Sequence, residues 1–176
     1  MQNIAALPTP VSSPEPQSLA RLIGQIAGMI SSENFPSGDR AALKRLAPDR
    51  PPSLAFYRFC FLNLPKSWQN NVGAWQTLLA GLAVMGIKPH RPDRPVGQAL
   101  AEHRYSEARL ERLLVAQDDV LYTLTLRLAR FLAAKGESVN WLDLANLLLA
   151  KDRDKQETVR LKIAGDYYRH QKTDKD

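Results

Sequence analysis

The spacing of apolar residues along this chain follows the turn of an α-helix almost everywhere, and it limits the folds open to the chain. Leu and Ala together number 47, against 20 for Val, Ile and Thr. Leu and Ala favour helices, whereas β-branched residues favour strands. From Leu19 onward, apolar residues recur three, four and seven positions apart, which places them on one face of a helix. The sequence therefore predicts an all-α fold.

Changes in this spacing, together with prolines and capping residues, predict where the helices begin and end. The first helix is expected to begin near Gln17 or Ser18. Asp118 is a candidate N-cap for the second of two helices that divide the stretch 106–136. The other helices are predicted over residues 37–47, between Pro52 and Pro65, over 68–84 and 96–103, from Asn140 onward, and over the charged segment 151–175.

Two proline-rich segments suggest how the chain is organised. Residues 1–16 hold four of the twelve prolines and neither Lys nor Arg, so they are predicted to be a flexible, disordered tail. Residues 88–97, with the sequence KPHRPDRPVG, are predicted to be a basic linker. We therefore expect two small helical bundles, at 17–87 and 98–170, with a flexible tail at 171–176.

The charge and the cysteine content narrow the possible partners and compartments. Lys and Arg number 24 against 18 Asp and Glu, which gives a formal charge of +6. This moderate excess favours anionic partners, nucleic acid first. The single Cys60 cannot form an internal disulfide. No apolar run approaches the ~18–20 residues that cross a membrane, so a cytoplasmic location without a membrane partner is expected.

Residues that carry catalysis do not occur in the patterns that catalysis requires. The three histidines, His90, His103 and His170, have no HxxxH spacing, no adjacent Asp and no nearby cysteine. The carboxylate pairs lie among basic residues or at helix starts, where capping explains them. Phosphate-binding loops and nucleophile elbows are missing from the sequence. We therefore expect neither catalytic residues nor a metal or other cofactor, and a metal hydrolase is the weakest hypothesis.

Basic residues are more informative where helical spacing groups them. Nine of them are candidate contacts for nucleic-acid phosphates: Arg40, Lys44, Arg45, Arg58, Arg104, Arg109, Arg112, Arg127 and Arg130. The alternative interpretation is a solvated surface on which Glu107 and Glu111 offset Arg109 and Arg112. A base-stacking platform has less support, because most aromatic residues lie on apolar helix faces.

The order of several motifs resembles that of a known family. GDRAALKRL, SLAFYRFCFL, WQTLLAGLAVMG, VGQALAEHRYSEARLERLL and VNWLDLANLLL follow one another between Leu19 and Tyr168. This succession resembles the CasB family, the small subunits of the type I-E CRISPR Cascade complex. None of these motifs is a catalytic signature, so the resemblance rests on their order and spacing.

The resemblance implies a non-catalytic, all-helical protein of two bundles. Members of the family are present as two copies beside the backbone subunits of the complex. They help to hold the guide RNA, the target DNA and the displaced non-target strand, while a nuclease recruited by the large subunit cleaves the target. The basic residues that the resemblance carries over are Lys44, Arg45, Arg58 and Arg109, and the other five candidates come from helix geometry alone.

Two features depart from the family pattern. Gln98 stands where the family often has an arginine, in the motif GRALA, and this places that contact in doubt. The proline-rich tail is the other departure. The competing hypothesis is a helical adaptor that binds only protein, for which the abundant leucines and the mixed charges would suffice.

Overall fold

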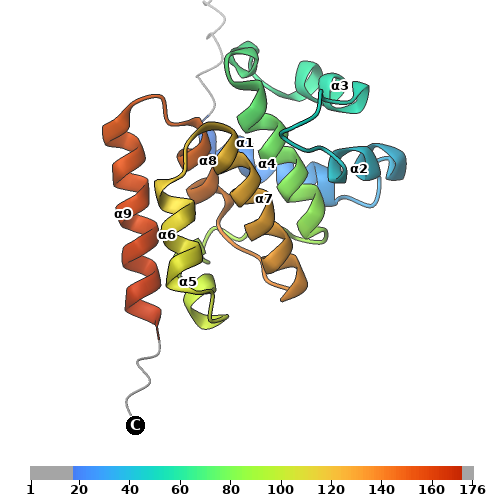
Figure 1. The fold of residues 1–176 in the computed structure, drawn as a ribbon. Coiled ribbons are helices and arrows are strands. Elements are labelled where there is room, and N and C mark those ends of the chain that lie inside the picture. Colours follow the sequence, from blue (N-terminus) through green and yellow to red (C-terminus); the bar gives the residue numbers. More distant parts are fainter. Residues whose placement is uncertain (1–17, 172–176) are drawn as a thin grey trace, which may run out of the picture.

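The computed structural model describes residues 18–171, and helices make up most of that part of the chain (Figure 1). The all-α prediction is confirmed there, with a bridge between His90 and Val139 as the one sheet-like contact among the described residues. The tail predicted at 1–16 and all but Gln171 of the tail predicted at 171–176 lie outside the described residues.

The elements are α1 (Leu19–Ser31), α2 (Ser37–Lys44), α3 (Leu54–Asn63), the 3-10 helix η1 (Lys66–Asn71), α4 (Val72–Met85), α5 (Val96–Glu102), α6 (Glu107–Val115), α7 (Asp118–Ala134), α8 (Trp141–Leu149) and α9 (Arg153–His170).

Capping side chains explain where several helices begin. The Ser18 hydroxyl accepts a hydrogen bond from the Arg21 amide, and Asn140 Oδ1 accepts one from the Leu142 amide. The Asp152 carboxylate does the same for α9. These acceptors satisfy amides that have no partner within the first turn of a helix. The prediction for Asp118 was wrong, because Asp118 is the first residue of α7 and Gln117 occupies the cap position.

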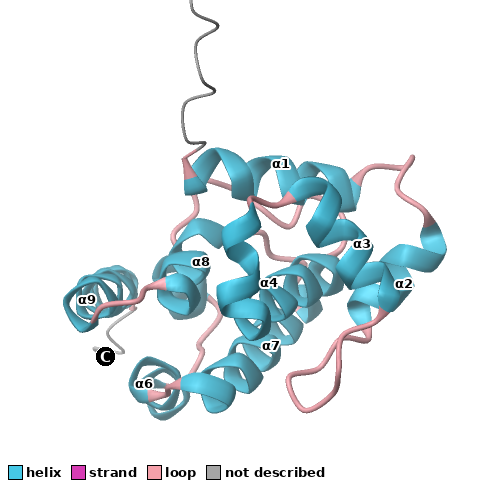
Figure 2. Ribbon diagram, turned by 90° about the horizontal axis from the view of Figure 1, so that it is seen from above, coloured by secondary structure: helices cyan, strands magenta, loops and turns pink. Residues whose placement is uncertain are grey.

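Helix α4 lies at the centre of the molecule, and other helices surround it (Figure 2). Most of its residues are apolar and buried, and α1, α2, α7 and α8 pack against it. Its buried polar side chains have backbone partners, since Gln76 donates to the Ala47 and Arg50 carbonyls and Thr77 to the Gly73 carbonyl. A helix without an exposed polar face must be enclosed in this way. Gly81 lets the Trp141 ring of α8 approach closely, since a Cβ at this position would lie 2.1 Å from that ring.

Buried side chains from both predicted bundles join one core cluster. Within it, α4 belongs to the predicted bundle 17–87, while its largest packing partner, α7, belongs to the predicted bundle 98–170. The division into two bundles stays a prediction.

The predicted linker 88–97 is fastened to the residues before α8. The Arg91 amide donates to the Val139 carbonyl at 2.9 Å, and the Asn140 amide donates to the Arg94 carbonyl at 2.7 Å. His90 Nδ1 accepts a hydrogen bond from the Trp141 amide at 3.0 Å. Burial lowers the pKa of His90, which favours the neutral imidazole that can accept this bond.

Arg94 connects three segments through its guanidinium group. It donates to both carboxylate oxygens of Glu137, at 3.1 and 2.9 Å, and to Glu102 at 2.6 Å. His103 Nε2 lies 2.7 Å from the Glu137 carboxylate. The hydrogen bond from Arg94 is the main cause that lowers the pKa of Glu137, and with Gln98 it lowers the pKa of Glu102 to about 2.

Helices α5 and α9 lie close together at Gly97. A Cβ at this position would lie 2.1 Å from the Ile163 carbonyl oxygen and 2.7 Å from the Tyr167 amide nitrogen. Both obstacles are backbone atoms, which cannot rotate away as a side chain can. The absence of a side chain at Gly97 is therefore a condition for the packing of α9.

We expect Gly97→Ala to lower the free energy of unfolding by about 3 kcal/mol, because the added methyl group forces α5 and α9 apart. Gly28→Ala is the matched control, since nothing lies within 4 Å of its Cβ position and α1 is helical there. That change should raise stability by up to about 1 kcal/mol. Urea denaturation followed by circular dichroism measures both, and equal effects would contradict the packing argument.

Arg94→Met should lower the free energy of unfolding at pH 7 by about 2–3 kcal/mol, because it leaves Glu137 partly buried without its main partner. Glu102 and Glu137 have folded-state pKa values below 4.5, so their contribution is present above pH 4.5 and is lost as the pH falls toward 2. The difference in the free energy of unfolding between the unchanged chain and Arg94→Met should therefore shrink as the pH falls from 4.5 toward 2.

The matched control for this experiment is Arg91→Met. Arg91 belongs to the same segment, and its ion pair with Asp93 is exposed, with 56% and 72% of the two side chains accessible. An exposed pair of this kind contributes little to stability, because water screens it. Denaturation at several pH values checks the prediction, and a difference for Arg94→Met that stays constant from pH 7 to pH 2 would refute it.

Candidate nucleic-acid interface

Three of the nine predicted residues meet around one hollow between α6 and α7. We call it the arginine groove, and it has a volume of about 240 Å³. Arg109 and Arg112 come from α6, and Arg127 comes from α7. The residues that line the groove are Tyr105, Arg109, Arg112, Leu124, Arg127 and Phe131.

Helical spacing and a pair of aromatic rings build the groove. On α7, Leu124, Arg127 and Phe131 lie three and seven positions apart, so they share one face. The Phe131 ring meets the Tyr105 ring edge to face, with 5.0 Å between centroids. Arg109 lies over the Tyr105 ring at 5.9 Å. The aromatic pair thus joins α7 to the start of α6 and holds a guanidinium group by a cation–π contact.

The charges of this groove are not offset by neighbouring acids. No Asp or Glu lines it, and within residues 18–171 no ion pair engages Arg109, Arg112 or Arg127. Glu107 and Glu111 instead line a hollow that faces α9, and Glu107 accepts a hydrogen bond from Gln171 at 2.8 Å. The two acids that could have neutralised the arginines therefore lie on another face of α6.

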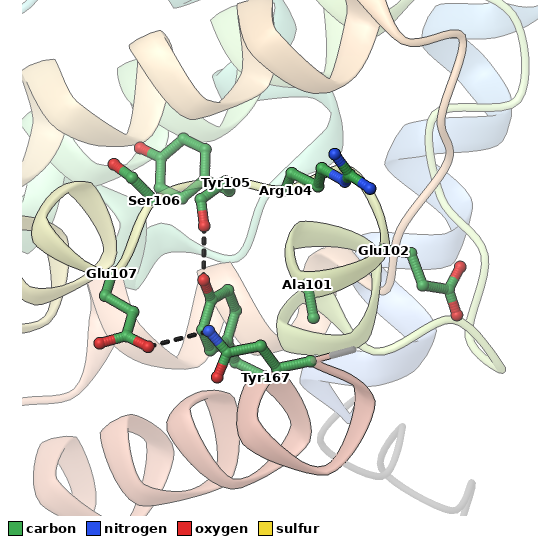
Figure 3. Close-up of a pocket in the computed structure, with 8 residues that line it drawn as sticks. Ala101, Glu102, Arg104, Tyr105, Ser106, Glu107 and Tyr167 are labelled. Atoms are coloured by element: carbon green, nitrogen blue, oxygen red, sulfur yellow. Dashed lines mark hydrogen bonds between the residues drawn. The ribbon is translucent and has the colours of Figure 1, made fainter. Parts of the chain in front are cut away.

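Arg104 lies in the neighbouring hollow drawn in Figure 3, which has a volume of about 300 Å³. Its backbone φ of 55° turns the chain between α5 and α6. The Tyr167 hydroxyl donates to the Tyr105 carbonyl and ties α9 to this turn. Glu102 and Glu107 also line this hollow, so its charge is mixed, unlike that of the arginine groove.

The predicted residues of α2 and α3 form a second group, at the end of the molecule opposite α6 and α9 (Figure 2). Lys44 and Arg45 are exposed. Arg58 is exposed as well, and its guanidinium lies 2.6 Å from the Asp39 carboxylate. Arg40 donates to the carbonyls of Ile30 and Ser32 and lies over the Phe35 ring, so its guanidinium group closes the end of α1.

Three residues in or beside the arginine groove were not among the predicted residues. Lys135 lies over the Phe131 ring at 5.8 Å and adds a cation beside the groove. Its spacing from Arg127 and Phe131, in steps of four, could have identified it. Tyr105 and Phe131 were not singled out. Arg130 is exposed on α7 but does not line the groove.

The three histidines have structural partners. In addition to His90 and His103, described above, His170 Nδ1 lies 2.8 Å from the Asp166 carbonyl oxygen. Among residues 18–171, His, Cys, Asp and Glu form no group of three or more that could hold a metal ion. None of the helices described is both long enough and apolar enough to cross a membrane.

A comparison with protein families identifies the chain. Residues 39–168, from α2 to α9, match the model of the CRISPR-associated protein Cse2 family. The chain belongs to the Cse2 family. Cse2 is the CasB small subunit of type I-E Cascade, so the resemblance drawn from the motifs is confirmed. No curated protein and no solved structure matches the chain.

The Cse2 match covers all nine predicted residues. At Gln98, where the family often has arginine, the side-chain amide donates to Glu102 at 3.0 Å. Gln98 therefore helps to hold Glu102, the carboxylate that also accepts from Arg94, and adds no cation.

We expect Asp39→Asn to increase the affinity for a single-stranded oligonucleotide a few-fold at low salt, because Arg58 then has no neutralising carboxylate. One added phosphate contact should steepen the slope of the logarithm of the binding constant against the logarithm of the salt concentration by about 0.7. Stability should change by less than about 1 kcal/mol, since the Arg58–Asp39 pair is partly exposed to solvent. Fluorescence anisotropy at several salt concentrations measures the affinity.

Asp93→Asn is the control, because it frees Arg91, which is not among the nine candidates, from a similar exposed pair. If both substitutions raise the affinity equally, the effect is one of net charge, and Arg58 is not at the interface.

Proposed function

We propose that this Cse2-family subunit of type I-E Cascade binds the phosphate backbones of the guide RNA, the target DNA and the displaced non-target strand, and thereby stabilises the R-loop. The observation that carries the proposal is the arginine groove, which three arginines from two helices line with no Asp or Glu among the described residues beside them. Exposed Lys44 and Arg45 on α2 add a second basic surface.

The mechanism follows from the balance of energies in an R-loop. The guide–target duplex that forms is about as stable as the DNA duplex that it replaces, so small contributions decide the outcome. Cations held on rigid helices that bind the displaced strand oppose its return to the target strand. Such contacts need no sequence selectivity, because base pairing with the guide supplies it.

The rest of the proposal concerns the setting of the subunit. It contacts the backbone subunits and the large subunit of a cytoplasmic complex, together with a second copy of itself. It has no catalytic residue and uses no metal or other cofactor, and target cleavage belongs to another protein. Its charge of +6 is moderate, which suits a subunit that holds nucleic acid inside an assembly.

A protein-binding role has its own support and remains the second candidate. On α3, the side chains of Leu54, Phe61 and Leu62 are 83%, 66% and 76% exposed. Several large apolar side chains exposed along one short helix favour a contact with another protein. A protein bound at α3 would leave the arginine groove open to nucleic acid, because α3 lies at the other end of the molecule from α6 (Figure 1).

The triple substitution Arg109→Gln, Arg112→Gln and Arg127→Gln should weaken binding to single-stranded DNA at least about tenfold. The slope of the logarithm of the binding constant against the logarithm of the salt concentration should also become shallower by about two, because three phosphate contacts are lost. In the reconstituted complex, R-loops should dissociate faster. Anisotropy titrations and a strand-displacement assay measure the two effects.

The control carries the same loss of charge at exposed lysines outside the nine candidates: Lys66→Gln, Lys88→Gln and Lys151→Gln. If the two triple variants bind alike, net charge and not the groove holds the strand. If neither variant alters R-loop stability while both still assemble, the protein-only role is the correct one.

A further inference from the structure

We infer that the arginine groove accepts an unpaired nucleotide, whose base enters the hollow while its phosphates lie against the arginines at the rim. This inference rests on the proposed function and specifies its ligand as single-stranded nucleic acid. It differs from a purely electrostatic contact, in which bases play no part.

The lining of the groove argues for more than a phosphate site. Leu124, Phe131 and Tyr105 line it together with the three arginines, so apolar and cationic side chains are combined. A phosphate needs cations and hydrogen-bond donors but gains nothing from apolar side chains. Sites for organic ligands combine apolar and aromatic side chains with a few polar groups that fix orientation. A hollow of about 240 Å³ also offers more room than a phosphate group occupies.

The rim supplies surfaces on which a base can stack. Guanidinium planes and aromatic rings are the two kinds of side chain that hold unpaired bases in protein complexes. Arg109 and Arg112 approach from α6 and Arg127 from α7, so the base would lie between two helices. None of the three is engaged in an ion pair within residues 18–171, which leaves the guanidinium groups available to both base and phosphate.

Aromatic contacts keep two cations in place around the hollow. Arg109 is held over the Tyr105 ring, and Lys135 is held over the Phe131 ring. The two rings are fixed against each other, and the Tyr105 carbonyl accepts a hydrogen bond from Tyr167 of α9. Arg109, Lys135 and the two rings are therefore held in place before a ligand binds, which lowers the entropy lost in ordering them.

Such a groove distinguishes single strands from duplexes. Bases in a duplex are paired and stacked, so one can enter a protein pocket only after it has been rotated out of the helix at a cost in free energy. In a single strand this cost is small. Among the strands of an R-loop, the displaced strand is the one whose bases are unpaired.

The test compares three ligands for the full-length chain by fluorescence anisotropy: a thymidine oligonucleotide, an abasic strand with the same number of phosphates, and a duplex of the same length. We expect the thymidine strand to bind about tenfold more tightly than the abasic strand, because stacking of a base is lost in the latter. The salt dependence of the two strands should be equal, since their phosphate numbers match.

A variant that fills the hollow without changing the charge provides a second measurement. Leu124→Phe should reduce the affinity for the thymidine strand to near that for the abasic strand and leave the abasic strand unaffected. Val120→Phe is the control, because Val120 is exposed on the same helix outside the groove. Circular dichroism checks that both variants fold. If Leu124→Phe does not fold, the comparison of the three ligands with the unchanged chain still tests whether a base enters the groove.

The outcomes separate this inference from the proposed function. Equal affinity of the thymidine and abasic strands overturns the inference, while a loss of binding in the triple arginine variant would still support the backbone contacts. If the triple variant also binds as tightly as the unchanged chain, both proposals fail. Tighter binding to the duplex than to the thymidine strand would likewise overturn the inference.

Discussion

Enclosure of α4 is the constraint on which the rest of the structure depends. Eleven of its fourteen residues are buried, and a helix of this kind can be stable in water only when other helices cover it. Helix α7 packs against α4 more extensively than any other helix does, and its Leu121, Leu128 and Leu132 are buried. That contact fixes the rotation of α7 and leaves the face with Arg127 and Phe131 beside α6, so the arginine groove is a consequence of how the core is closed.

The distribution of carboxylates explains why this groove stays cationic. Buried Asp143 is neutralised by Lys162 at 2.9 Å, and Glu137 is held by Arg94. Buried charges require such partners, since an unpaired one is costly. Glu107 and Glu111 face α9. These four acids thus join helices or lie on another face of α6, and none of them lines the arginine groove.

Much of the fold was predictable from local patterns, and part of the site was too. The break between α6 and α7 follows from spacing, and the start of α8 after the capping residue Asn140 follows from capping. Arg109, Arg112 and Arg127 were also identified from spacing. The contacts of Arg40 could not be predicted, because its acceptors are backbone carbonyls at the end of α1. No sequence pattern reveals such acceptors. Nor could spacing show that Tyr105 meets Phe131.

The sequence by itself determined that the chain is helical, which residues share a face within each helix, and, through the order of its motifs, that it belongs to the Cse2 family. Only the tertiary structure decided which faces meet. Helical periodicity is a property of neighbours along the chain, whereas the contact of α6 with α7 depends on side chains distant in sequence and on how they fill space together. The close approach at Gly97 and the partner of each arginine were decided at that level.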